Sequence, residues 1–135
     1  MTATSPPTWL PTADHLAHSG PARLVRHFGL PDYDALLHYA LEQPAAYWRG
    51  VAEVCEFVWD TPPTGYVDFT NGREFPLWFP GARLNWVKSV LAWADRADGA
   101  SRLAIVDERE DGSVDSLDYA ALRTRVLALA SALTQ

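Results

Sequence analysis

The chain has 135 residues, of which 48% are hydrophobic and 21% charged. A chain of this size and composition can bury one core of its own, which excludes an intrinsically disordered protein. Its net charge of −6, from 17 acidic and 11 basic side chains, argues against a nucleic-acid partner. The sequence has neither a signal-peptide pattern nor an apolar run long enough to cross a bilayer, and Cys55 is its single cysteine. We therefore expect a cytoplasmic protein without a membrane partner.

The first third of the chain predicts an arm and two short helices. Residues 1–20 are rich in Thr, Ser and Pro, so we expect an extended arm that Trp9 and Leu10 fix to the body. Pro21 suits the first position of a helix that Gly29 ends. Asp32 is a good N-cap for a second helix. The inner face of that helix should carry Leu36, Leu37, Ala40 and Leu41.

A third helix and a long loop follow. Pro44 ends the preceding helix and opens the next, because its missing N–H would be unpaired in a first turn. From Thr61 to Phe75, prolines and glycines predict a loop with at most a short strand at Tyr66–Phe69. An apolar stripe of helical period predicts that the third helix buries Tyr47, Val51, Val54, Cys55 and Val58.

The stretch from Phe75 to Trp93, here called the aromatic corner, combines prolines, tryptophans and a helix-start signal. Its two prolines should hold Leu77 and Phe79 in extended conformations, and Gly81 should then allow a turn. Asn85 is the expected N-cap of a helix running to about Asp95. The buried face of that helix should carry Trp86, Val90, Trp93 and Ala97.

The last part of the chain predicts a hairpin and a helix. The apolar run Leu103–Val106 predicts a strand covered on both faces, and Glu110–Ser113 should turn the chain into a second strand at Val114–Leu117. Asp118 can cap a final helix that reaches the last residue without a glycine or a polar tail, so we expect a longer protein to continue there. One side of it should be lined by Leu122, Val126, Leu129 and Leu133. The fold class is therefore α+β, mainly short helices and long loops with a C-terminal β-hairpin followed by a helix.

No catalytic or metal-binding residue is predicted. The sequence contains none of the usual phosphate-loop, dinucleotide, nucleophile-elbow or zinc-protease motifs. His15 and His18 are three residues apart but lie in a segment without helical pattern, and Cys55 reads as a packing residue. The acidic residues Asp107, Glu108, Glu110 and Asp111 are typical of a solvated hairpin turn.

One weak anion site is predicted, at Arg83 and Asn85. A guanidinium and the amide donors at a helix start would converge there, although Arg83 could equally brace the corner through backbone carbonyls. The six tryptophans could form a ligand platform, but they more readily fill a core.

Several motifs resemble the start of the acetyl-CoA and acetoacetyl-CoA synthetases, which are adenylate-forming acyl-CoA synthetases. The most specific is W-F-P-G-A-R-L-N at Trp78–Asn85, which resembles the family pattern W-F-x-G-(G/A)-x-(L/I)-N and precedes an apolar helix. Trp9–Thr12 resembles W-x-P-(S/T), and L-D-Y-A-A-L at Leu117–Leu122 stands in place of L-T-Y-x-E-L. Further matches, in order, are Leu24–Phe28, Tyr33–Leu37, Glu42–Trp48, Val67–Phe69 and Ala104–Val106. The resemblance covers nearly the whole chain.

The resemblance implies a partial domain of a larger adenylate-forming fold. Residues 1–20 would be an arm, 21–97 the helical N-terminal region, and 98–135 the start of the large, here truncated, adenylation domain. The family's phosphate loop, adenine and ribose motifs and lid lysine lie downstream, and no position here matches them. The complete enzyme would use ATP, Mg²⁺ and CoA to convert a carboxylic acid into its acyl-CoA, whereas this chain would bind no cofactor. The structural residues would be Trp78, Phe79, Pro80, Gly81, Leu84, Asn85 and Trp86.

Three functions remain open at this point. The first is a structural, non-catalytic N-terminal fragment of such a synthetase, with the remainder of the adenylation domain as partner and possible self-association through an exposed apolar face. The second is a free-standing protein-interaction module with the same fold. The third is a small-molecule-binding domain that uses its tryptophans.

Overall fold

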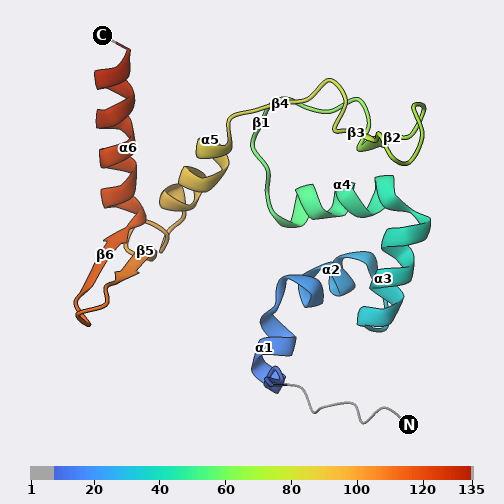
Figure 1. Ribbon diagram of the computed structural model, residues 1–135, viewed down its shortest axis with the longest axis horizontal. Coiled ribbons are helices and arrows are strands. Elements are labelled where there is room, and N and C mark those ends of the chain that lie inside the picture. The colour runs from blue at the N-terminus through green and yellow to red at the C-terminus, as the bar shows by residue number, and fades with distance from the viewer. Residues whose placement is uncertain (1–7, 135) are drawn as a thin grey trace. The chain divides into compact units, whose positions relative to one another are not determined.

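The computed structural model describes residues 8–134, and its elements are labelled in Figure 1. In this part of the chain a run of helices is followed by a run of short strands, and then by a helix, a β-hairpin and a last helix. Helices and strands are thus segregated along the chain, so the predicted α+β class is confirmed. The described residues form two compact units. The first takes in the chain up to Phe57 together with Thr61–Arg83, and the second takes in Val58–Asp60 and the chain from Leu84 onward.

Four helices make up most of the first unit, and side-chain caps define where they begin. The N–H of Ala22 is bonded to the hydroxyl of Ser19 at 3.2 Å, and the N–H of Ala35 to the carboxylate of Asp32 at 2.8 Å. Gly29 ends the helix at residues 20–28 with a φ of 64°, so its predicted end is confirmed. The helix begins at Gly20, one residue before the predicted first position at Pro21, because the cap is Ser19. The helices are α1 (Ala13–His18), α2 (Gly20–Phe28), α3 (Tyr33–Glu42) and α4 (Pro44–Val54).

The extended arm predicted for residues 1–20 is wrong over α1. Residues 1–7 lie outside the described part of the chain. Thr12 caps α1 by accepting the N–H of His15 at 3.2 Å. One capping bond and the contact of α1 with α2 are enough to order a helix of six residues that shows no apolar period.

The core of the first unit is small and lies between α2, α3 and α4. Its buried apolar side chains are Leu24, Leu36 and Ala52. The predicted inner face of α3 is only partly right, because Leu37 and Leu41 are exposed. The predicted stripe of α4 also ends early: the helix stops at Val54, and Cys55 and Val58 are exposed. Periodicity marks an apolar face, but not how much of it the neighbouring helices cover.

Short strands follow α4. Strands β2 (Val67–Asp68) and β3 (Leu77–Trp78) pair antiparallel, with Val67 opposite Trp78. The predicted strand near Tyr66–Phe69 is thereby confirmed. Strands β1 (Trp59–Thr61) and β4 (Arg83–Leu84) lie where the chain passes from one unit to the other.

The second unit contains a helix, a hairpin and the final helix. The two strands of the hairpin pair antiparallel, and a register shift falls between Leu103 and Ile105. Asp118 caps the final helix by accepting the N–H of Ala121 at 2.7 Å, as predicted. The elements are α5 (Trp86–Leu91), a 3₁₀ turn (Ala92–Asp95), β5 (Leu103–Glu108), β6 (Val114–Asp118) and α6 (Tyr119–Leu133).

Burial in the second unit differs from the sequence prediction. The buried side chains of α5 are Ser89 and Leu91, whereas Trp86 and Ala97 of the predicted face are exposed. Ser89 accepts the N–H of Val58 at 2.9 Å, which satisfies a polar group in this small core. Within residues 8–134, no helix combines the length and the apolar character that crossing a membrane requires.

Candidate functional site

The first half of the aromatic corner packs on α4. The ring of Trp48 meets Trp78 at a centroid distance of 5.4 Å and Phe79 at 6.4 Å, in both cases edge to face. Tyr66 contacts Phe79 in the same way at 6.0 Å. Edge-to-face pairs stabilise aromatic clusters beyond the burial of their area. The rings here therefore serve packing within the first unit.

The backbone of the corner departs from the prediction at Phe79. Its φ is 48°, although Pro80 after it favours an extended conformation. The N–H of Phe79 donates to the carbonyl of Tyr66 at 3.2 Å, and its own carbonyl accepts the N–H of Ala82 at 3.0 Å. These bonds and the ring contacts hold a conformation that bulky residues rarely adopt. Gly81 makes the expected turn, with a φ of 75°.

The predicted anion site at Arg83 and Asn85 stays a prediction. Arg83 is exposed in β4, and the side chain of Asn85 accepts the N–H of Val87 at 3.1 Å as the cap of α5. The predicted N-cap is thus confirmed. Helix α5 has six residues, so few peptide dipoles add up at its start. Residues Leu84, Asn85 and Trp86 belong to the second unit, whereas Trp78–Arg83 belong to the first.

The other ionisable candidates have local partners. His15 lies 2.6 Å from the hydroxyl of Thr12, and His18 lies 3.1 Å from the carboxylate of Asp14. Both histidines lie on α1, which corrects the expectation that their segment has no helix. Among residues 8–134, no three His, Cys, Asp or Glu side chains are grouped closely enough to hold a metal ion.

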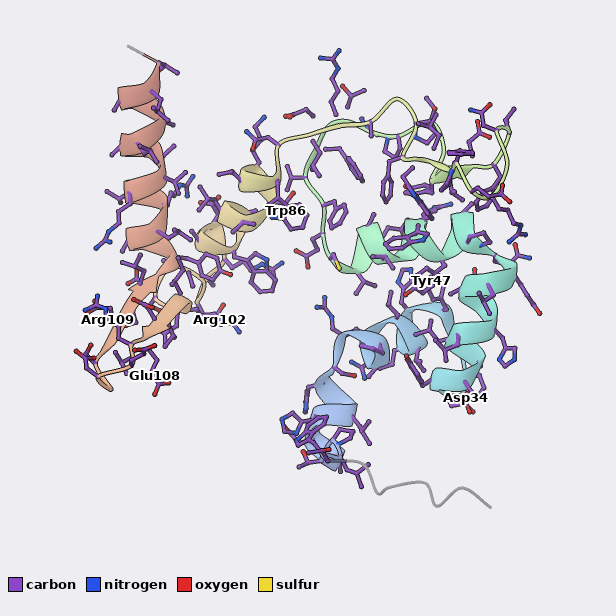
Figure 2. The ribbon with its side chains drawn as sticks, viewed as in Figure 1. Asp34, Tyr47, Trp86, Arg102, Glu108 and Arg109 are labelled. Carbon is purple, nitrogen blue, oxygen red and sulfur yellow. The ribbon has the colours of Figure 1, made fainter. Side chains whose placement is uncertain are left out.

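Glu110 and Asp111 lie in the hairpin turn, as predicted, whereas Asp107 and Glu108 form the end of strand β5; Glu108 and Arg109 are labelled in Figure 2. Arg109 forms ion pairs with Asp107 and Asp115. The hydroxyl and the N–H of Ser113 both donate to Asp111, and these bonds lower the pKa of that carboxyl below its usual range. The cluster therefore stabilises its own turn.

An uncovered apolar surface of the second unit lies on the hairpin and α6. Leu103 and Val106 on β5 and Val114 on β6 are exposed, so the prediction of a strand covered on both faces is wrong for this chain alone. Side chains project from α6 around its axis (Figure 2), and among its described residues none is buried. Because leucines and alanines occupy most of its circumference, such a helix is typical of one enclosed by further structure. Its exposed leucines are Leu127, Leu129 and Leu133.

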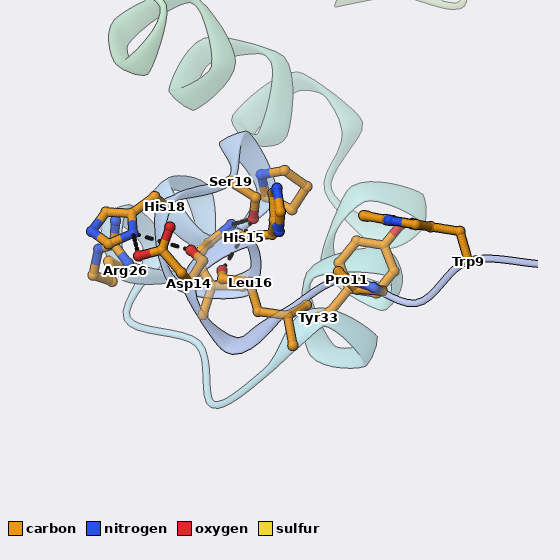
Figure 3. Close-up of a pocket in the computed structure, with 12 residues that line it drawn as sticks. Trp9, Pro11, Asp14, His15, Leu16, His18, Ser19, Arg26 and Tyr33 are labelled. Atoms are coloured by element: carbon orange, nitrogen blue, oxygen red, sulfur yellow. Dashed lines mark hydrogen bonds and ion pairs between the residues drawn. The ribbon is translucent and has the colours of Figure 1, made fainter.

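A pocket of about 850 Å³ lies in the first unit, beside α1 (Figure 3). The aromatic rings of Trp9 and Tyr33 lie on one side of it, and the ion pair of Asp14 with His18 lies on the other, near Arg26. Sequence reasoning named Trp9 as an anchor of the arm and as part of the motif at Trp9–Thr12, but not as part of a pocket. It missed the pocket because residues 9–33 come together through capped turns that give no periodic signal.

Comparison with known proteins gives consistent results. Residues 33–90 match the family model described as the acetyl-coenzyme A synthetase N-terminus. An acetyl-coenzyme A synthetase of Methylobacillus flagellatus is 33% identical over 107 residues, which are 78% of this chain and 16% of the relative. An acetoacetyl-coenzyme A synthetase of Rhizobium meliloti is 27% identical over 133 residues, 94% of this chain and 20% of the relative.

The fold leads to the same group of proteins. The structure of an acetoacetyl-CoA synthetase from Streptomyces lividans superposes with a TM-score of 0.70 at 25% identity, over 96% of this chain and 21% of that one. This chain thus spans about a fifth or less of the length of the proteins it matches. In sequence and in fold, the chain is similar to the N-terminal region of acyl-CoA synthetases.

Proposed function

We propose that this chain is the N-terminal part of an ATP-dependent acyl-CoA synthetase in the cytoplasm and has a structural, non-catalytic role in it. The complete enzyme would join a carboxylic acid to CoA through an acyl-adenylate, with release of AMP and pyrophosphate. ATP, Mg²⁺ and CoA would bind to the remainder of the enzyme, because the sequence here lacks the motifs for them. We assign no residue of this chain to the reaction.

The observation that supports this proposal most directly is the uncovered apolar surface of β5, β6 and α6, together with the match to relatives several times longer. An exposed surface of this kind is unfavourable in water unless another structure covers it. The remainder of the adenylation domain is the proposed partner. In its absence, a second copy of the chain would cover part of the same surface.

The test has two parts. The purified chain should release no pyrophosphate from ATP with acetate, Mg²⁺ and CoA, and light scattering should show self-association. Ile105→Asp and Leu129→Asp should both reduce that association, since each places a charge in the apolar surface. Glu110→Ala, at the exposed hairpin tip, is the matched control and should leave it unchanged.

Two results would overturn the proposal. Pyrophosphate release by the purified chain would show that it is itself catalytic. A monodisperse monomer that melts at high temperature would show that the apolar surface needs no cover. The latter result would favour the second candidate, a free-standing interaction module, which the exposed aromatic side chains Trp9 and Trp86 otherwise support only weakly.

A further inference from the structure

The pocket beside α1 has the size and lining of a small-molecule site. Its volume of about 850 Å³ falls within the range of about 300–1,000 Å³ that ligand pockets occupy. Trp9, Leu16 and Tyr33, which line it, are 65%, 57% and 53% exposed. When a ligand covers large apolar side chains that line a hollow and are open to water, apolar surface is removed from water, and this stabilises the complex.

The rings of the pocket favour a flat ligand. Trp9 and His15 lie edge to face with centroids 5.8 Å apart, and Tyr33 contributes a third ring to the lining. Figure 3 shows Trp9 and Tyr33 on the same side of the hollow. Aromatic faces and edges attract a further ring in stacked or edge-to-face geometry.

The charges of the pocket favour an uncharged ligand. The carboxylate of Asp14 is paired with His18 at 3.1 Å, and Arg26 donates to the carbonyl of Ala17 at 2.9 Å. His15 is held by the hydroxyl of Thr12 at 2.6 Å. The carboxylate of Asp14 and one N–H of Arg26 thus already have partners, and a charged ligand would lose part of its hydration against the apolar rings.

We propose that this pocket binds a planar, uncharged aromatic small molecule. The proposal does not depend on the role of the chain in a synthetase. Eleven of the twelve lining residues precede residue 33, where the match to the family model begins. The capped helices α1 and α2 shape the hollow without help from the second unit.

The test uses 2-naphthol as an uncharged probe and 2-naphthoate as its charged analogue, titrated into the isotope-labelled full chain and followed by NMR. 2-Naphthol should shift the signals of Trp9, Leu16 and Tyr33 saturably and should bind more tightly than 2-naphthoate. Leu16→Asp should weaken its binding about tenfold or more, because a carboxylate would enter the apolar lining. Leu41→Asp makes the same change at another exposed leucine, outside the lining; it is the control and should bind as the parent does.

The remaining outcomes contradict the proposal. Signals from the ring cluster of Phe28, Tyr39 and Tyr47 show in the same spectra that the first unit is folded in every variant. With that unit folded, non-saturable shifts, shifts confined to α6 and the hairpin, or unchanged binding in Leu16→Asp would overturn the site. Tighter binding of 2-naphthoate would overturn the assignment of an uncharged ligand.

Discussion

The ring of Phe28 occupies the space that a side chain at Gly50 would need. A Cβ built on Gly50 would lie 2.2 Å from Cζ of Phe28. The centroid of the same ring lies 4.7 Å from that of Tyr39 and 6.3 Å from that of Tyr47, on which it stacks. The close approach of α2 and α4 in the first unit thus depends on a missing side chain, and three aromatic rings fill the interface.

Gly50→Ala should therefore destabilise the chain by about 1–3 kcal/mol, because the added methyl group forces Phe28 out of its place. Chemical denaturation followed by circular dichroism measures the change. Gly20→Ala is the matched control: Gly20 is also helical and has open space around it, so its substitution should be neutral or mildly stabilising. If Gly50→Ala were as harmless as Gly20→Ala, the packing described for α2 and α4 would be wrong.

Gly81→Ala should cost about 1–2 kcal/mol, since a residue with a Cβ resists the positive φ of 75° at this turn. Gly65→Ala serves for comparison, because its Cβ would meet only Cγ of Pro80 at an ordinary 3.5 Å. Thermal unfolding of both variants provides the measurement. If both variants lost the same amount of stability, the loss in Gly81→Ala could not be due to the positive φ of Gly81.

Asp118→Ala should destabilise α6 by about 0.5–2 kcal/mol, because it removes the oxygen that accepts the N–H of Ala121 at 2.7 Å. Asp118→Asn keeps an acceptor at this position and should retain most of the stability. The stability of the two variants is compared by following the loss of the helical circular dichroism signal on heating. A deficit of the same size in Asp118→Asn would point to charge and not to capping.

The pKa of Asp111 should rise toward its usual value in Ser113→Ala, because the strongest bond to the carboxylate is the one from the Ser113 hydroxyl. The backbone N–H of residue 113 remains, so the rise should be incomplete. A pKa lowered in the folded state stabilises the fold above the usual carboxyl range, and this contribution is lost as the pH falls through the folded value. NMR titration of the carboxyl carbon measures the pKa of Asp111. The pKa of Asp68, which is lowered by Thr70, should not change in Ser113→Ala.

The sequence predicted the parts of this fold that depend on a few neighbouring residues. The caps Asp32, Asn85 and Asp118 and the turn at Gly81 are all confirmed, because each rests on one side chain or one glycine and the adjacent backbone. The positive φ of Phe79 escaped prediction because it is held by residues distant in the chain, Tyr66 and Trp48.

Burial was predicted poorly for a different physical reason. An apolar period shows that a face is suited to a core, but the partner that covers it must be present for that face to be buried. Leu41, Cys55 and Trp86 were all expected inside and are exposed. The pocket could not be predicted, because it arises where the residues before α1 and the short helix α1 itself, which shows no apolar period, meet α2 and the start of α3.

The second unit is assembled from two separate stretches, Val58–Asp60 and the chain from Leu84 onward. They are joined by the ion pair of Asp60 with Lys88 and by the N–H of Val58, which donates to the hydroxyl of Ser89. No single cleavage can separate the two units cleanly. A gene trimmed to begin at Leu84 would leave the hydroxyl of Ser89, a residue only 8% exposed, without its amide donor, and would discard one charge of the ion pair. Anyone preparing the hairpin and α6 for crystallisation should splice the tripeptide 58–60 back onto the shortened chain.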